Sequence, residues 1–132
     1  MMNDVLRDEQ EQGTWIELRF LSHDAEPDEG SWLFVAFGRH GKTERESRFG
    51  WTNRVVHAFI HLLKHFPEEK YNSYFLHIEE DFFLRWVYEW ATDRYLLISE
   101  YEGQLFPLKT SKSALLNWAE GLELSLLEAS SK

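Results

Sequence analysis

The sequence predicts an α+β fold, an antiparallel sheet of about five strands with two main helices packed mainly on one of its faces. Apolar and polar residues alternate along several short segments, which is the two-residue period of a half-buried strand. The period changes to that of a helix over residues 52–65 and again over residues 113–128. Short turns join most of the predicted strands, so hairpins predominate. A length of 132 residues fits a single domain, residues 1–132, because two domains would each be close to the lower size limit.

The first third of the chain contains two predicted strands and a long loop. Residues 1–12 lack periodicity, and we expect them to form a disordered N-terminal tail. Residues 14–21 alternate as a half-buried strand does, and residues 32–37 form an apolar run typical of a strand covered on both faces. These two strands are expected to pair antiparallel. Residues 38–50 are predicted to form a polar, basic surface loop.

The first helix is predicted over residues 52–65. Thr52 or Asn53 can cap its start, and Pro67 stops it. At about 100° per residue, its large apolar residues gather on one side and three histidines fall on the other. The apolar side contains Val55, Val56, Phe59, Leu62, Leu63 and Phe66, and the opposite side contains His57, His61 and His65.

The second half is predicted to contain three strands, a short edge segment and the second helix. The strands span residues 74–78, 82–90 and 94–101, with a tight turn at 91–93 between the last two. The edge segment spans residues 105–108. The apolar face of the second helix contains Leu115, Trp118, Ala119, Leu122 and Leu126. No internal repeat is visible in the sequence.

Composition excludes several classes of protein. Apolar residues make up 43% of the chain and aromatic residues 16%, too much for a disordered chain. The absence of cysteine excludes disulfide scaffolds and thiolate chemistry. The longest apolar runs are far shorter than the ~20 residues that a membrane-spanning helix needs. The polar, acidic N-terminus does not resemble a secretory signal. We therefore expect a cytoplasmic protein that does not insert into a membrane.

Charge is distributed unevenly and predicts the kind of partner. The chain has 23 acidic and 14 basic residues, a formal net charge of −9. Acidic residues dominate residues 1–30 and 67–132, whereas basic residues dominate residues 31–66. Such a field repels nucleic acid and attracts basic proteins. The expected partner is a basic protein and not a nucleic acid.

The helical histidines and two short segments contain the residue types that metal binding, acid–base catalysis or phosphate binding use. The spacing of the three helical histidines would let neighbours share a metal, but the HExxH pattern is missing, so we expect a solvent-facing stripe without a metal. Residues 79–81, three adjacent acids, are either a solvated turn or a cation or acid–base site. Residues 38–42 depart from the phosphate-binding loop pattern. No catalytic motif is present, and we expect neither an enzyme nor a cofactor.

Aromatic residues alternate along residues 82–90, where Phe82, Trp86, Tyr88 and Trp90 share one face. Aromatics at this period usually belong to a core, but tryptophan and tyrosine also anchor protein interfaces. Trp15 is predicted to point outward from its strand. The sequence does not decide whether these aromatic residues belong to the core or to a protein interface.

The aromatic hairpin DFFLRWVYEWATDRYLLISEYEG and the leucine-rich segment SALLNWAEGLELSLLEA cover about a third of the chain. In general character the chain resembles the immunity proteins of bacterial polymorphic-toxin and contact-dependent growth inhibition systems. The resemblance implies an inhibitor that covers the active site of a basic toxin or nuclease. The alternatives are a small enzyme built around His57, His61, Glu79 or Asp81, and a phage-encoded inhibitor or adaptor. The residues predicted to contact the partner are Asp24, Glu26, Asp28, Glu29, Glu79, Glu80, Asp81, Trp15 and Trp90.

Overall fold

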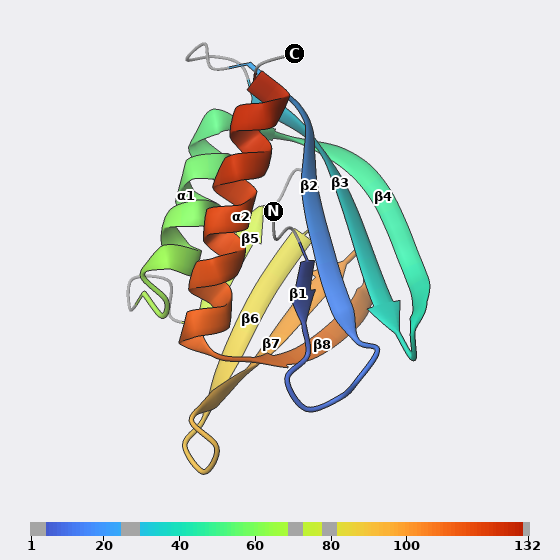
Figure 1. The fold of residues 1–132 in the computed structure, drawn as a ribbon, viewed down its shortest axis with the longest axis vertical. Helices are drawn as coiled ribbons and strands as arrows, with labels where there is room; N and C mark the ends of the chain where they lie inside the picture. Colours follow the sequence, from blue (N-terminus) through green and yellow to red (C-terminus); the bar gives the residue numbers. More distant parts are fainter. Residues whose placement is uncertain (1–4, 25–29, 69–72, 78–81, 131–132) are drawn as a thin grey trace.

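A computed structural model describes residues 5–24, 30–68, 73–77 and 82–130. Over these residues the chain runs through four strands and a helix, and then through four more strands and a second helix (Figure 1). The first set is β1 (Val5–Arg7), β2 (Trp15–His23), β3 (Gly30–Arg39), β4 (Lys42–Thr52) and α1 (Asn53–Lys64). The second set is β5 (Tyr74–His77), β6 (Phe82–Glu89), β7 (Arg94–Tyr101), β8 (Gln104–Thr110) and α2 (Lys112–Ser130).

The strands form two antiparallel sheets of four strands each, in the orders β1-β2-β3-β4 and β5-β6-β7-β8. We call them sheet A and sheet B. The predicted α+β class and antiparallel pairing are confirmed, but the prediction of one sheet of about five strands is wrong. Sequence alternation locates strands, whereas their division into sheets depends on which edges pair, and alternation does not report that.

The prediction of a surface loop over residues 38–50 is wrong. The chain turns at His40 and Gly41, both at positive φ, and returns as β4, which pairs with β3 from Lys42 to Thr52 with one register shift between Phe37 and Gly38. Five of the 11 residues of β4 are charged, as is common in an edge strand, and its two large apolar side chains, Phe49 and Trp51, come only at its end. Charged edges protect a sheet from pairing with other chains, and they also conceal the strand period.

The disordered tail predicted over residues 1–12 is wrong for Val5–Arg7, which forms β1. Asp8 then fixes the following turn, because its carboxylate accepts hydrogen bonds from the backbone amides of Gln10, Glu11 and Lys109. The amide of Glu9 also donates to the carbonyl of Lys109. The N-terminal segment is thereby joined to β8 of the other sheet.

Both helices lie side by side and pack against strands of sheet A, α2 mainly on β2 and α1 on β3 and β4 (Figure 1). α1 begins at the predicted cap, where Thr52 Oγ1 accepts from the Val55 amide, and it ends at Lys64. In α2, Ser111 Oγ accepts from the Ala114 amide at 3.2 Å. The two predicted helices are confirmed within two residues at each end.

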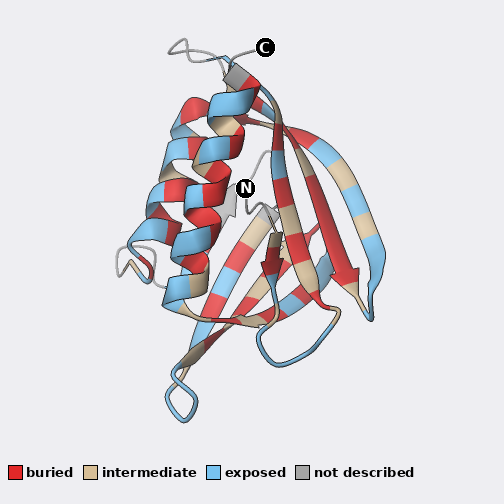
Figure 2. Cartoon of the chain, viewed as in Figure 1, coloured by how far each residue is buried: buried red, intermediate tan, exposed pale blue. Residues whose placement is uncertain are grey.

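One hydrophobic core lies between the sheets and helices, and its buried residues alternate with exposed ones along the strands (Figure 2). Phe37 of sheet A stacks on Phe106 of sheet B with ring centroids 4.0 Å apart. Phe59 of α1 meets Trp118 of α2 edge-on. The core therefore joins both halves of the chain.

Candidate protein-binding surface

Sheet B places apolar side chains on both of its faces. Its inner face packs into the core, with Leu84, Trp86, Leu97 and Phe106 all buried. The pairing register then fixes which residues lie together on the outer face. Its rows are Tyr74–Arg85–Ile98–Pro107, Phe83–Glu100–Leu105 and Val87–Leu96–Lys109.

The outer face of sheet B is open and mainly apolar. Val87 is 55% exposed, Leu105 48% and Tyr74 38%, while Phe83 and Ile98 are partly exposed. In the described chain, the strands that pack closely against a helix all belong to sheet A, so no helix covers this face. We define the sheet B outer surface as Tyr74, Phe83, Arg85, Val87, Leu96, Ile98, Glu100, Leu105 and Pro107.

An uncovered antiparallel face normally carries polar residues, so an apolar one indicates a binding surface. Two ion pairs lie at one end of the sheet B outer surface. Lys109 Nζ lies 2.9 Å from Glu89 Oε1, and Arg94 Nε lies 2.5 Å from Glu9 Oε1. These neutralised charges form a polar border, which is the usual surround of an apolar interface centre.

The turn between β6 and β7 extends away from the body of the molecule (Figure 1) and carries Trp90, which is 83% exposed. Tyr88 is also exposed, and its hydroxyl donates to Asp93 Oδ1 at 2.8 Å. This hydrogen bond to Asp93 raises the pKa of Tyr88. Trp90 is therefore exposed to solvent, and its predicted role as an anchor for a partner stays a prediction.

The structure divides the predicted aromatic stripe. Trp86 is buried in the core, whereas Tyr88 and Trp90 lie beyond it and are exposed. The side chain of Phe82 lies outside the described residues. Trp86 is therefore a core residue. For Tyr88 and Trp90, at the exposed end of the hairpin, a role in a protein interface stays a prediction.

Three of the predicted partner-binding residues, Trp15, Asp24 and Trp90, lie within the described residues, each in a different part of the fold. Trp15 lies on the outer face of sheet A, half-buried, with its ring against Gly38. Asp24 is exposed at the end of β2, and its carbonyl accepts from Asn53 Nδ2 at 2.9 Å. Trp90 lies in the turn between β6 and β7. Glu26, Asp28, Glu29, Glu79, Glu80 and Asp81 lie outside the described residues.

The predicted histidine stripe is confirmed as solvent-facing, since His57, His61 and His65 are all exposed. His61 Nδ1 lies 3.0 Å from Glu68 Oε1, and the His61 and His65 rings are 4.3 Å apart. Among the residues that the structure describes, no three histidine or carboxylate side chains are grouped so as to hold a metal ion.

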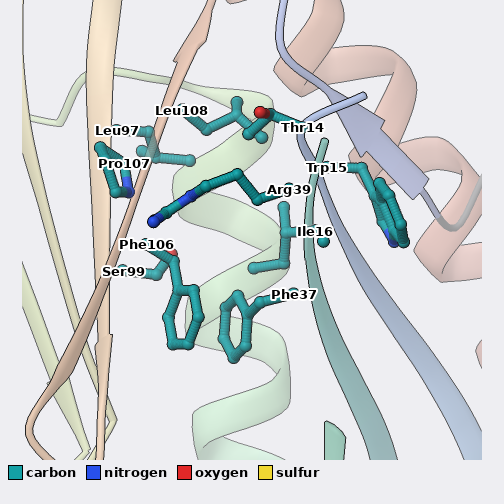
Figure 3. A pocket seen from close by; sticks show the side chains of 11 residues that line it. Thr14, Trp15, Ile16, Phe37, Arg39, Leu97, Ser99, Phe106, Pro107 and Leu108 are labelled. Atoms are coloured by element: carbon teal, nitrogen blue, oxygen red, sulfur yellow. The ribbon is translucent and has the colours of Figure 1, made fainter. Parts of the chain in front are cut away.

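Two hollows are large enough or enclosed enough to compare with a substrate site. One lies between the sheets, where the Phe37 and Phe106 rings face each other and Arg39 extends across, while Trp15 lies apart (Figure 3). Its volume of ≈10 Å³ holds about one water molecule. The other is a groove of ≈400 Å³ between α1 and α2, with Ile60 and Leu127 in its lining. The lining of the groove also includes His57, His61, Lys64 and Glu123. Lys64 Nζ is paired with Glu123 Oε1 at 2.5 Å, and both histidines are exposed to solvent.

The sheet B outer surface is not among the surfaces that the sequence predicts. The available signal was the consecutive run Leu96-Leu97-Ile98, which is apolar on both faces of one strand. Such a run indicates a strand covered on both sides. In β7 only one side is covered by the described chain.

Comparison with protein-family models, curated proteins and solved structures finds no match for this chain. No helix in the described ranges is long and apolar enough to cross a membrane. Functional inference therefore depends on the chemistry of the surface.

Proposed function

We propose that this chain is a small protein-binding inhibitor of the immunity type, which neutralises a basic toxin or nuclease by covering its active site. The observation that carries the proposal is the sheet B outer surface, an uncovered apolar face with a charged border. Burial of this face against a partner would release its apolar area from water, at about 25 cal/mol per Å² before the costs of association.

The charge of the chain supports a basic partner. A net charge of −9 accelerates encounter with a positively charged protein, and salt screens that effect. Glu100 lies on the surface itself. The acidic residues Glu79, Glu80 and Asp81 directly precede β6 in the sequence. In this proposal, charge sets the association rate and the apolar rows set the lifetime of the complex.

The test uses the product of the gene adjacent to the gene for this chain. Growth arrest by that product is expected to be relieved by co-expression of the wild-type chain. Leu105→Asp on the sheet B outer surface should abolish rescue and weaken binding about tenfold or more, as a charge at an apolar interface centre does. Leu124→Asp on α2 is the matched control, because Leu105 and Leu124 are both 48% exposed.

Three outcomes would overturn the proposal. The first is full rescue by Leu105→Asp, and the second is equal damage by Leu124→Asp. The third is turnover of a small molecule by the purified chain without any partner. Calorimetric titration of the two purified proteins measures the affinity, and stopped-flow mixing at about 50 mM and about 300 mM salt measures the screening.

A further inference from the structure

The outer face of sheet A carries two arginines against one aromatic ring. The register places Arg19 of β2 and Arg48 of β4 on either side of Phe34 of β3. The Cζ atom of Arg19 lies 4.9 Å from the centroid of the Phe34 ring, and that of Arg48 lies 6.0 Å from it. Cation–π contacts hold both guanidinium groups over the same ring.

These two arginines have spare hydrogen-bond donors. Arg19 has one described carboxylate neighbour, Glu17, at the outer limit of an ion pair at 3.9 Å. Arg48 makes no ion pair or hydrogen bond within the described ranges, although it is exposed. By contrast, Arg45 on the same strand pairs with Glu102. A guanidinium group stacked through its face keeps its N–H edge for a carboxylate, which it binds through two hydrogen bonds.

The rows on either side of the arginine row differ in chemistry. On one side Trp32 is 48% exposed, with its ring against Gly50. On the other side Glu17 and Glu46 flank Ala36. The face therefore presents an aromatic row, a basic row and an acidic row in succession. Successive rows on one face of a sheet are about 7 Å apart.

We propose that the outer face of sheet A binds an extended peptide segment of a partner protein, with an apolar, an acidic and a basic side chain at alternate positions. Side chains two apart on an extended peptide are also about 7 Å apart, so its period matches the rows. The apolar side chain would contact Trp32, the carboxylate would bind Arg19 and Arg48, and the basic group would bind Glu17 and Glu46. A hollow of ≈200 Å³ lined by Phe34, Glu46, Ser47 and Arg48 adjoins this path.

The acidic row favours a peptide over a nucleic acid. A phosphodiester chain carries a charge at every nucleotide, so it would meet Glu17 and Glu46 as well as the arginines. A peptide can place a carboxylate on one row and a base on the next. The proposal goes beyond the inhibitor function, because it uses the other sheet and another class of contact.

The experiment uses two acetylated, amidated heptapeptides of equal composition, Thr-Phe-Thr-Glu-Thr-Lys-Thr and its charge-swapped form Thr-Phe-Thr-Lys-Thr-Glu-Thr. Titration followed by amide and indole NMR shifts measures the dissociation constant and locates the site. The first peptide is expected to bind about tenfold more tightly, since the second puts a lysine over the arginine row in either orientation. Shifts should centre on Trp32 and Arg48.

Two arginine variants distinguish a specific binding site at Arg48 from nonspecific electrostatic attraction between peptide and protein. Arg48→Gln is expected to remove the preference between the peptides, whereas Arg54→Gln, an exposed arginine on α1, should leave it within about twofold. Both changes are at exposed positions, so both variants should fold. Leu105→Asp on sheet B should also retain the preference between the two peptides. Because Leu105→Asp tests the inhibitor proposal, failure of that proposal can be told apart from failure of this one.

The proposal is overturned if neither peptide binds or both bind equally. It is also overturned if Arg54→Gln has the same effect as Arg48→Gln. Binding of an eight-nucleotide oligothymidylate with the same dependence on Arg48, and more tightly than the first peptide, would assign the face to single-stranded nucleic acid instead.

Discussion

We expect His23, at the end of β2, to make the stability of the fold depend on pH. Its Nδ1 lies 2.8 Å from Ser31 Oγ. Partial burial lowers the pKa of His23, the nearby His57 lowers it further, and Asp24 acts in the opposite direction. An unfolded histidine titrates near pH 6.5. Below that pH the unfolded chain binds a proton that the folded His23 resists, so the free energy of unfolding should fall as the pH falls.

Urea unfolding at about pH 7.5 and about pH 5.5 checks this expectation. His23→Gln should lose less stability between the two values than the wild type, because its side chain does not titrate. His65→Gln, which changes an exposed histidine, should lose as much as the wild type. Equal losses in all three proteins would show that His23 does not control the effect.

For Trp15, the sequence predicts the direction of the side chain but not its burial. Alternation along 14–21 predicts that Trp15 points outward, and it does. Its ring is nevertheless half-buried, because the residue paired with it is Gly38. A Cβ atom at Gly38 would lie 2.2 Å from that ring. The neighbour across the sheet depends on register, which the sequence of one strand does not specify.

At the scale of elements, strands and helices with a strong apolar period were predictable and charged ones were not. α1 follows from its apolar period and its cap at Thr52, and α2 from the helical spacing of Leu115, Trp118, Ala119, Leu122 and Leu126. β4 was missed because its exposed residues are charged and only Phe49 and Trp51 are large and apolar. The sheet B outer surface was missed for a related reason. Leu96 and Ile98 look like core residues until the packing shows that no described element covers them.

A side chain of α2 forms a hydrogen bond with the backbone of β2 at an irregularity in that strand. The pairing of β2 with β3 shifts register between Phe20 and Ser22, and the Phe20 amide there donates to the buried hydroxyl of Ser125 at 3.1 Å. Ser125→Ala should lower the free energy of unfolding by about 1–3 kcal/mol, because a buried amide loses its acceptor. Chemical denaturation measures the loss. Ser113→Ala, at an exposed position of the same helix, should change stability by less than about 0.5 kcal/mol. Equal values for the two variants would contradict this role.

At the scale of the whole molecule, the chain repeats one order of elements, four strands and then a helix. The sequence shows no repeat, yet the two helices begin alike. Thr52 and Ser111 each accept from the amide three residues later. Phe59 and Trp118, seven residues after these caps, meet in the core. Equivalent positions therefore share geometry while their side chains differ, which is why only the structure reveals the repetition.

The two halves should unfold together, because their sheets share one core through the stacked rings of Phe37 and Phe106. Phe106→Ala should lower the free energy of unfolding by about 3–5 kcal/mol, the usual cost of an emptied aromatic site. Circular dichroism and tryptophan fluorescence should still give coincident urea transitions, since both sheets lose the same contact. Leu105→Asp, one residue earlier on the outer face of the same strand, should leave stability within about 0.5 kcal/mol. Separate transitions in the two signals would show that each half is stabilised by a core of its own. An equal loss in Leu105→Asp would show that the stability lost in Phe106→Ala does not come from the contact with Phe37.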